Sequence, residues 1–369
     1  MLQRIFIDNF RQLVNFEITL ERINLFLGYN GTGKSTVFDV LKKIQQFARG
    51  DSANTLFHIN DLTRWQKSLI QYFELVIGGN GGIYNYELAI EFDKVKRTAQ
   101  VHHERLSFDG KKLFEFDQSE EQGQFYGDDQ SAKEWVMPFV SFQSVLPIVS
   151  RIQQKNTHVQ WFVKQLSRFI ITQINPGIML KSSDKEASQL SATADNFVSW
   201  YRYISQNQKA VFSITTALQE IWDGFEYFRF VEAGESRWLV LSFFMQDGSS
   251  IDYTFDELSD GQRALIVLYA LLHFAASENC ILCIDEPENY LALSEIQPWL
   301  LSLYDFCNDN KLQSLIISHH PEFINHLAAS GGYWFDCQQN GPVRVSRIGS
   351  NGDVGISMSE LVARGWIHA

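Results

Sequence analysis

Eight residues near the N-terminus have the types and the spacing of a phosphate-binding loop. Residues 28–35 read GYNGTGKS and fit the pattern G-x-x-x-x-G-K-[ST]. Glycines let successive backbone N–H groups point inward around phosphate oxygens, and a following helix adds its positive end. Lys34 is expected to reach the β- and γ-phosphates, and the Ser35 hydroxyl to coordinate Mg²⁺. The residues expected to bind the nucleotide here are Asn30, Gly31, Thr32, Gly33, Lys34, Ser35 and Thr36.

A second segment supplies the carboxylates that such a loop needs. Residues 280–286, CILCIDE, form an apolar strand that ends in two acidic residues. We expect Asp285 to hold Mg²⁺ through water, and Glu286 to polarise the attacking water as a general base. The alternative is a strand that merely ends in acidic surface residues, and the phosphate loop in the same chain disfavours it. The expected ligands are therefore ATP and Mg²⁺.

Residues 258–262, LSDGQ, precede an apolar helix that starts at Arg263. The segment resembles the LSGGQ signature of ABC-type ATPases. A Ser hydroxyl, a Gly N–H and a helix N-terminus together can bind a γ-phosphate, which assigns Ser259, Gly261 and Gln262 to the site. The resemblance implies that this segment acts on the nucleotide of another subunit, in a head-to-tail dimer with two sandwiched ATPs. By themselves, the five residues are a common helix N-cap pattern.

Residues 316–321, IISHHP, form a strand that ends in histidine 34 residues after Asp285. This resembles the switch histidine of ABC ATPases, which senses the γ-phosphate, and the alignment favours His319 over His320. A metal bound by both histidines is disfavoured, because adjacent strand residues point to opposite faces. The same argument makes Cys280 and Cys283 core residues, since no second Cys pair exists.

Other segments resemble the RecF/SMC/OLD side of the ABC superfamily, and the OLD-like predicted AAA-family ATPases most of all. They are the opening with DNFR at 8–11, DEPE at 285–288, SHHPEF at 318–323 and SELVARGW at 359–366. The resemblance implies that Arg11 approaches the nucleotide. Gln143 is our candidate for the Mg²⁺-coupling glutamine of the Q-loop, against the alternative of a surface-loop glutamine. Where these ATPases often carry Leu-His-Pro after the DEPE segment, this chain has Leu-Ala-Leu at 291–293.

These motifs need a scaffold of strands and helices. Strands are expected at 2–7, 14–20 and 22–27, a helix at 36–48, an antiparallel meander at 70–116 and a surface loop at 117–129. We predict an α/β fold, a P-loop NTPase head of the ABC type with a mixed sheet, an antiparallel β subdomain and an inserted helical lobe. The expected domains are the first part of the head (1–149), the helical lobe (150–235) and the second part of the head (236–369). No long heptad section lies between Lys34 and Leu258, so we expect a compact lobe and not an SMC-type coiled-coil arm.

Composition places the protein among packed globular chains. It has 369 residues, 45% hydrophobic and 20% charged, with a net charge of −12. No transmembrane span and no signal peptide is expected, and four unevenly spaced cysteines favour a reducing cytoplasm. Residues 151–212 carry a net charge of +5 within this acidic chain. That segment is either a solvated helical face or a surface for a polyanion such as DNA.

We therefore expect an ATP-hydrolysing dimer or higher oligomer without a nuclease domain of its own. It would act as a sensor or regulatory subunit with a separate effector, such as a TOPRIM-type nuclease, in antiviral defence. The defence role rests on resemblance alone. The alternatives are a RecF-like DNA-binding ATPase in repair or recombination, and a scaffold in which ATP is structural. A transporter subunit is least favoured, because the N-terminal strand and the lobe resemble another branch.

Overall fold

The computed structural model describes residues 1–118, 122–126, 133–138, 141–152, 157–337, 341–349 and 357–365. The chain forms two compact units, one of residues 1–169 with 331–350 and one of residues 170–330 with 351–369. The domain boundaries expected at 149/150 and 235/236 stay predictions. Three helices fall within the expected lobe, α4 (Thr157–Ser167), α5 (Phe197–Ile204) and α6 (Gln208–Gln219), and α3 (Leu146–Ile152) crosses its expected start. The same range also contains three strands, β10 (Phe169–Thr172), β11 (Ser182–Ser183) and β12 (Phe225–Ala233).

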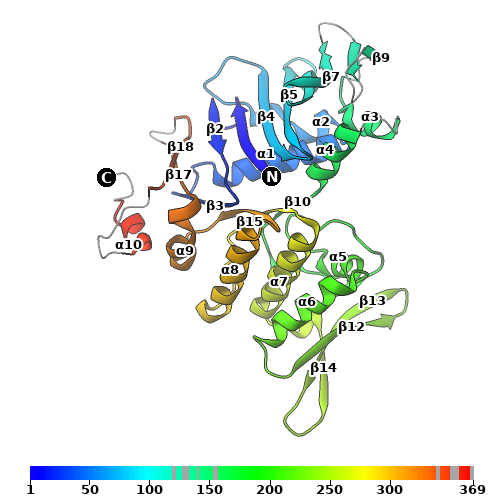
Figure 1. The fold of residues 1–369 in the computed structure, drawn as a ribbon, viewed down its shortest axis with the longest axis vertical. Helices are drawn as coiled ribbons and strands as arrows, with labels where there is room; N and C mark the ends of the chain where they lie inside the picture. Colours follow the sequence, from blue (N-terminus) through cyan, green and yellow to red (C-terminus); the bar gives the residue numbers. More distant parts are fainter. Residues whose placement is uncertain are drawn as a thin grey trace. The chain divides into compact units, whose positions relative to one another are not determined.

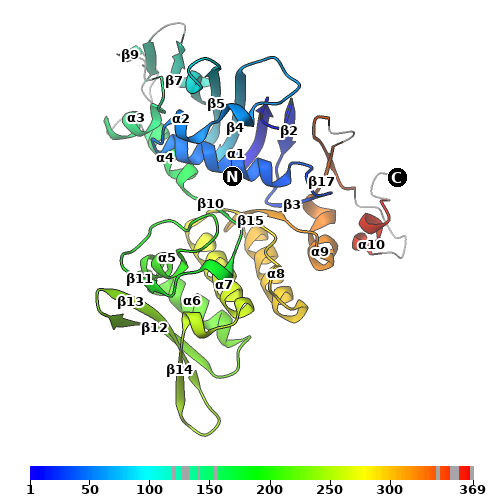
Figure 2. The ribbon, with the colours of Figure 1, turned by 180° about the vertical axis from the view of Figure 1, so that it is seen from behind.

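An antiparallel sheet dominates the first unit (Figures 1 and 2). Its strand order is β2-β1-β4-β5-β6-β7-β8-β9, which confirms the expected meander at 70–116. The surface loop expected at 117–129 is wrong in part, because residues 122–126 form a strand that pairs with β7. Residues 119–121 and 127–129 lie outside the described residues. The strands are β1 (Leu2–Asp8), β2 (Phe16–Thr19), β4 (Ile70–Gly79), β5 (Gly82–Asp93), β6 (Thr98–Phe108), β7 (Lys111–Asp117), β8 (Gln122–Tyr126) and β9 (Lys133–Pro138).

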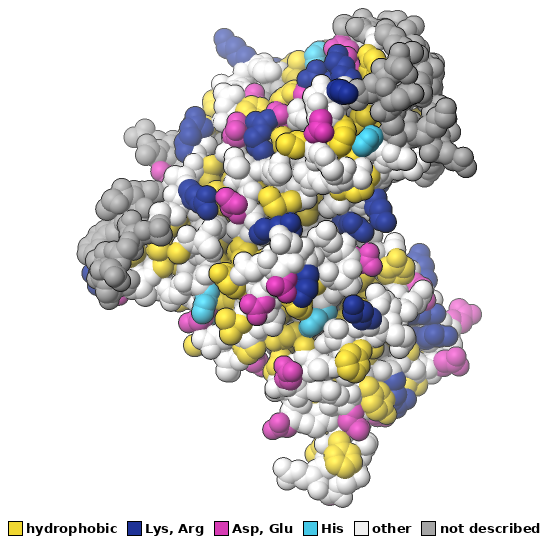
Figure 3. Space-filling model, in the orientation of Figure 1, with side chains coloured by type: hydrophobic (Ala, Val, Ile, Leu, Met, Phe, Trp, Pro, Cys, Tyr) yellow, Lys and Arg dark blue, Asp and Glu magenta, His cyan; other side chains and the backbone are white. Residues whose placement is uncertain are grey.

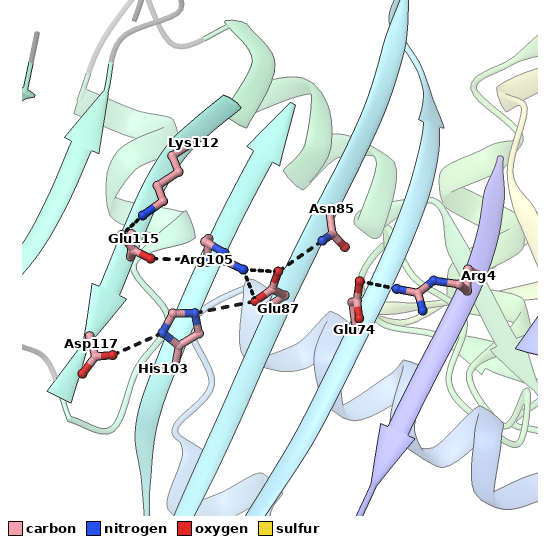
Figure 4. Close-up of polar contacts among 9 residues, drawn as sticks. All are labelled: Arg4, Glu74, Asn85, Glu87, His103, Arg105, Lys112, Glu115 and Asp117. Carbon is pink, nitrogen blue, oxygen red and sulfur yellow. Dashed lines mark hydrogen bonds and ion pairs between the residues drawn. The ribbon is translucent and has the colours of Figure 1, made fainter. Parts of the chain in front are cut away.

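One face of this sheet is apolar and the other carries a charged ladder. Because side chains alternate along a strand, the two faces take different residue types. The apolar face packs against α1 (Lys34–Ala48) through Phe73, which contacts Phe57, which in turn contacts Phe47 of the helix. Figure 4 shows the other face, where ion pairs link neighbouring strands. Arg105 of β6 donates to Glu87 of β5 at 2.6 Å and lies 3.5 Å from Glu115 of β7.

A second group of strands in the first unit holds the phosphate loop. The fully buried β3 (Ile23–Gly28) pairs in parallel with β17 (Gly332–Asp336), which pairs antiparallel with β18 (Arg344–Arg347). α1 starts directly after the loop and buries the apolar positions that its helical spacing brings to one side. The remaining elements are α2 (Ala53–Leu56), η1 (Ile59–Asp61), α3 (Leu146–Ile152) and α4 (Thr157–Ser167).

The second unit contains a parallel strand pair and two long helices. β15 (Ile281–Asp285) pairs with β16 (Gln313–Ile317) so that Asp285 lies opposite Ile317. Two helices contact these strands, α7 (Asp260–Glu278) on β15 and α8 (Leu293–Asn308) on β16. α7 ends at Asn279, which takes a left-handed conformation with φ 54°. The parallel pair therefore places its carboxyl ends, residues 285 and 317, side by side.

An antiparallel sheet and shorter helices complete the second unit. The sheet consists of β11 (Ser182–Ser183), β12 (Phe225–Ala233), β13 (Ser236–Phe244) and β14 (Ser250–Thr254). The helices are α5 (Phe197–Ile204), α6 (Gln208–Gln219), α10 (Met358–Ala363) and the short η3 (Pro176–Ile178) and η4 (Phe255–Glu257). β10 (Phe169–Thr172) and α9 (Pro321–Gly331) run across the boundaries between the units. Trp366 of the expected C-terminal motif lies outside the described residues.

Candidate nucleotide site

The phosphate loop connects β3 to α1, as the sequence predicts. Gly28, Gly31 and Gly33 have φ values of 143°, 81° and 88°, a region that residues with side chains rarely adopt. A Cβ atom on Gly28 would lie 2.3 Å from the carbonyl oxygen of Phe335, so the loop starts in close contact with β17. A Cβ atom on Gly31 would meet no atom within 4 Å. The backbone is therefore tight where the loop leaves the sheet and open at Gly31.

Lys34 is buried at the first position of α1. Its Nζ atom donates to the carbonyl oxygens of Gly28 (2.6 Å) and Tyr29 (2.9 Å), so the ammonium lies across the loop. Thr32 is buried and its hydroxyl donates to the same Tyr29 oxygen at 2.8 Å. The remaining loop residues are exposed (Asn30, Gly31 and Ser35) or half-buried (Gly33 and Thr36). An open glycine backbone, a lysine and a helix N-terminus fit a triphosphate.

Arg11 lies against the side of α1. Its guanidinium pairs with Asp39 of α1 at 2.7 Å and with Asp61 at 3.0 Å, and it packs over the ring of Phe10. Asp39 is five residues beyond Lys34, so these pairs hold Arg11 beside the second turn of the helix. The backbone of Arg11 has a φ of 51°, a conformation that costs free energy for a residue with a side chain.

Gln143 lies at the opposite end of α1 from the phosphate loop. The residue is exposed, and its Nε2 atom donates to the carbonyl oxygen of Gly50 at 3.3 Å, just beyond the last residue of the helix. The 15 residues of α1 separate this position from Ser35 by about 20 Å at 1.5 Å per residue. One metal ion cannot bind both side chains at that separation, so we remove Gln143 from the candidate site.

The two carboxylates of the second segment lie where β15 ends. Asp285 is its last residue, and Glu286 follows with a φ of 50°. The Glu286 N–H donates to the carbonyl oxygen of Ile317 at 2.8 Å, which continues the ladder to β16. The side chain of Glu286 accepts a hydrogen bond from Asn289 at 3.0 Å. The left-handed backbone at Glu286 thus turns the chain sharply out of the strand.

The switch segment follows β16 and contacts the turn after Asp285. Ser318 is buried, whereas the side chain of His319 is exposed. The Ser318 hydroxyl donates to Oε1 of Glu288 at 2.7 Å, and the His319 N–H donates to the same oxygen at 3.3 Å. Burial raises the pKa of Glu288, and these hydrogen bonds oppose that effect. In the sequence, Glu288 is recognisable only as part of the DEPE segment, and nothing there indicates this contact.

The signature segment caps α7. Ser259 is the N-cap residue: its hydroxyl accepts from the Gln262 N–H at 3.3 Å, and the Gln262 side chain accepts from the Ser259 N–H at 3.0 Å. This is a capping box, which satisfies two backbone donors at the start of a helix. A Cβ atom on Gly261 would lie 2.7 Å from the carbonyl oxygen of Tyr290. Tyr290 is therefore a second residue of the site that the motifs did not identify.

Within the second unit, the loop 286–290 joins the separate motifs. It begins at the end of β15, contacts the switch segment through Glu288 and contacts the signature helix through Tyr290. Asn30–Thr36 and Arg11 belong to the first unit, whereas Asp285, Glu286, His319 and the signature belong to the second. A hydroxyl and a carboxylate, as Ser35 and Asp285 provide, are oxygen donors of the kind that Mg²⁺ prefers.

Clusters of metal-ligating side chains would indicate a separate metal site, and a long apolar helix would indicate a membrane span. Among the residues that the structure describes, no group of three or more His, Cys, Asp or Glu side chains could by itself hold a metal ion. His320 Nδ1 accepts from the Glu322 N–H at 3.3 Å, and the thiols of Cys280 and Cys283 are buried. No helix within the described ranges is long and apolar enough to span a bilayer.

Comparison with known proteins gives two matches to family models. Residues 142–325 match the model described as "AAA domain, putative AbiEii toxin, Type IV TA system", and residues 1–105 match the model described as "AAA ATPase domain". No curated protein matches the sequence.

Solved structures with a similar fold include heads of SMC proteins. The SMC head domain from Thermotoga maritima is 15% identical, with a TM-score of 0.50 over 94% of this chain and 98% of that one. An SMC head bound to the C-winged helix domain of ScpA is 11% identical, with a TM-score of 0.52 over the same shares. A head with an extended coiled coil, bound to the C-terminal domain of ScpA from Pyrococcus furiosus, is 10% identical, with a TM-score of 0.50 over 100% and 99%.

The fold is thus the α/β fold of SMC and ABC-type ATPase heads, with mixed sheets and helices, which confirms the predicted fold class. Together with the two AAA matches, it supports an ABC-type P-loop ATPase of the AAA/SMC-like class.

Proposed function

We propose that the protein binds and hydrolyses ATP with Mg²⁺ in a dimer that sandwiches two nucleotides. The observation that carries the proposal is the loop between β3 and α1, with Lys34 buried across it and an open backbone at Gly31. Both family matches are to AAA domains, and one of them includes this loop. Open backbone N–H groups directly before a helix N-terminus form a site that binds phosphate.

Each candidate residue has a defined task in this proposal. Lys34 moves from its loop carbonyls to phosphate oxygens, while Gly31 and Gly33 offer backbone N–H groups. Mg²⁺, when bound by Ser35 and through water by Asp285, neutralises charge on the phosphates. Glu286 accepts the proton of the attacking water, and His319 orients the γ-phosphate. Asn30, Thr32 and Thr36 complete the loop, and Arg11, held beside α1 by its ion pair with Asp39, approaches the nucleotide.

The signature supports the dimer. Ser259 and Gln262 leave the N-terminal end of α7 capped, with the Ser259 side chain exposed. A helix end of this kind binds anions, and we propose that it receives the γ-phosphate of the nucleotide held by a second copy. Two of the SMC heads with a similar fold are bound to domains of ScpA, which supports a separate partner protein for this chain as well.

The proposed biological role is a regulatory ATPase that acts with a separate effector, such as a nuclease, in antiviral defence in the cytoplasm. The OLD-like resemblance supports this role. The RecF-like alternative needs a basic surface, and the basic segment 151–212 belongs partly to each unit. Lys181 pairs with Asp256, and Arg202 lies 3.9 Å from Glu186, so part of its charge is neutralised. Lys155 and the Arg151 side chain lie outside the described residues.

The face drawn in Figure 3 adds no support for DNA binding. On that face, acidic side chains lie among the basic ones over the described part of each unit. A DNA-binding surface concentrates basic residues on one face.

The test of nucleotide binding compares two lysines of α1. Lys34→Ala should weaken binding of a fluorescent ATP analogue at least about tenfold, since it removes a charge-assisted contact with phosphate. Lys42→Ala, on the same helix, is the matched control and should bind like the wild type. Equal affinity of the Lys34→Ala variant and the wild type would contradict the proposal.

A further inference from the structure

The carboxylate of Glu288 connects two catalytic segments that are thirty residues apart. It extends from the turn after β15, and its partners follow β16. Oε1 accepts from the Ser318 hydroxyl at 2.7 Å and from the His319 N–H at 3.3 Å. The Ser318 hydroxyl also accepts from the His320 N–H at 3.0 Å. One carboxylate oxygen therefore holds the backbone at residue 319 directly and at residue 320 through Ser318.

Keeping a carboxylate at this position costs free energy. Glu288 Oε2 is shielded from solvent, and no hydrogen-bond partner within the described ranges contacts it. Burial of an unpaired polar atom is unfavourable, because the atom loses its hydrogen bonds to water and gains none in the protein. α9 begins at Pro321, directly after these residues, so its positive end recovers part of that cost. An alanine would avoid the cost, but it would leave the Ser318 hydroxyl and the His319 N–H without this acceptor.

We propose that Glu288 is a positioning residue, which holds the backbone of His319 so that its exposed imidazole keeps the orientation needed for ATP hydrolysis. This inference rests on the proposed function. Glu286, by contrast, acts on the attacking water itself. The two acidic residues of the same turn thus have different tasks: Glu286 is catalytic, and Glu288 acts through His319.

Turnover is measured in four proteins: the wild type, Glu288→Ala, His319→Ala and the double variant. Glu288→Ala should lower kcat about tenfold, because a misplaced catalytic group costs rate steeply, and should leave the affinity for a fluorescent ATP analogue unchanged. In the His319→Ala background the same substitution should change kcat less than about twofold, since residues that act as a unit are not additive. Equal fold-losses in both backgrounds would overturn the inference.

Glu288→Gln is the conservative variant. Its amide oxygen can replace Oε1, and its amide nitrogen takes the place of the unpaired Oε2. The variant should therefore keep kcat within about threefold of the wild type. Glu295 supplies a matched control, because its carboxylate also accepts a backbone N–H, that of Ala292 at 2.9 Å. Glu295→Ala should not lower kcat in the way that Glu288→Ala does.

Amide hydrogen exchange tests the contact between Glu288 and the His319 backbone without a measurement of ATP hydrolysis. The amides of His319 and His320 should exchange at least about tenfold faster in Glu288→Ala than in the wild type or in Glu288→Gln. Unchanged exchange at these two amides would overturn the inference. If exchange rises but the wild type hydrolyses no ATP, the proposed function fails and the positioning role of Glu288 in hydrolysis fails with it. If His319→Ala alone leaves kcat unchanged, only the role of the histidine and its positioning is overturned.

Discussion

The carbonyl oxygen of Tyr290 occupies the space that a side chain on Gly261 would need. A Cβ atom built on Gly261 would lie 2.7 Å from that oxygen, which is shorter than the contacts that Cβ atoms make in proteins. The first turn of α7 is therefore in direct contact with the loop 286–290, which also carries Glu286 and Glu288. In the proposed dimer, the signature helix and the carboxylates serve different nucleotides, so this contact would link the two sites within one chain.

Gly261→Ala tests that contact. The added methyl group must displace either the loop or the helix, and we expect kcat to fall at least about tenfold, since displacements of about 1 Å at a catalytic site have effects of this size. Gly177→Ala is the matched control, because a Cβ atom there would lie 3.5 Å from the Asn175 side chain, an ordinary contact. The measurement is the steady-state ATPase rate of each variant. Equal rates would show that the contact between Gly261 and Tyr290 has no functional role.

Ser259 combines a cap with a proposed phosphate ligand, and two substitutions separate these roles. Ser259→Ala should lower the free energy of unfolding by about 1 kcal/mol and abolish ATP-dependent dimerisation. Ser259→Asp restores a good N-cap but places a negative charge against phosphate, so it should recover stability without dimerisation. Urea unfolding and light scattering measure the two quantities.

The control for Ser259 is another N-cap of the second unit. Ser357 caps α10 by accepting from the Glu360 N–H at 3.3 Å. Ser357→Ala should leave ATP-dependent dimerisation unchanged. Normal dimerisation of the Ser259→Asp variant would show that the hydroxyl is not a phosphate ligand.

Glu104 makes stability depend on pH. Its carboxylate is fully buried and accepts from Tyr86 (2.8 Å), Ser144 (2.6 Å) and the Val145 N–H (3.1 Å). Burial raises its pKa from 4.5 to about 7 despite these hydrogen bonds. The folded state thus holds the proton more tightly, so this contribution to stability is complete below the ordinary pKa and is lost as the pH rises through about 7.

The expected loss from Glu104 is about 3 kcal/mol between pH 4.5 and pH 8, at 1.36 kcal/mol per pKa unit. Glu104→Gln cannot ionise and should lack that loss. Urea unfolding of both proteins across this pH range gives the difference between their free energies of unfolding. The contributions of the other titratable groups cancel in that difference. Parallel pH curves would show that Glu104 does not titrate in this way.

Local sequence predicted much of the fold and part of the site. The phosphate loop, α1 and the apolar strands β15 and β16 could be recognised because each is a short, continuous pattern. Contacts between distant segments could not be recognised. Neither the acceptor role of Glu288 nor the closeness of Gly261 and Tyr290 follows from spacing, because both depend on how β15, β16 and α7 pack.

Gln143 is a residue for which the local sequence predicts a role that the tertiary structure does not support. Its place between the meander and the helical segment suggests a Q-loop glutamine, but its contact with Gly50 puts it at the far end of α1. The polar composition of residues 117–129 likewise favoured a loop, whereas pairing with β7 makes residues 122–126 a strand. In both cases a tertiary neighbour decided the outcome, and local residue types did not.

The central claim is that Glu286 activates water in an ATP-bound dimer. The most direct test is Glu286→Gln, which keeps the size and the hydrogen bond from Asn289 and removes the base. We predict turnover at least about 100-fold below the wild type, the contribution typical of a general base, together with a stable dimer in Mg²⁺-ATP seen by light scattering. Unchanged turnover with no ATP-dependent dimer would contradict the account.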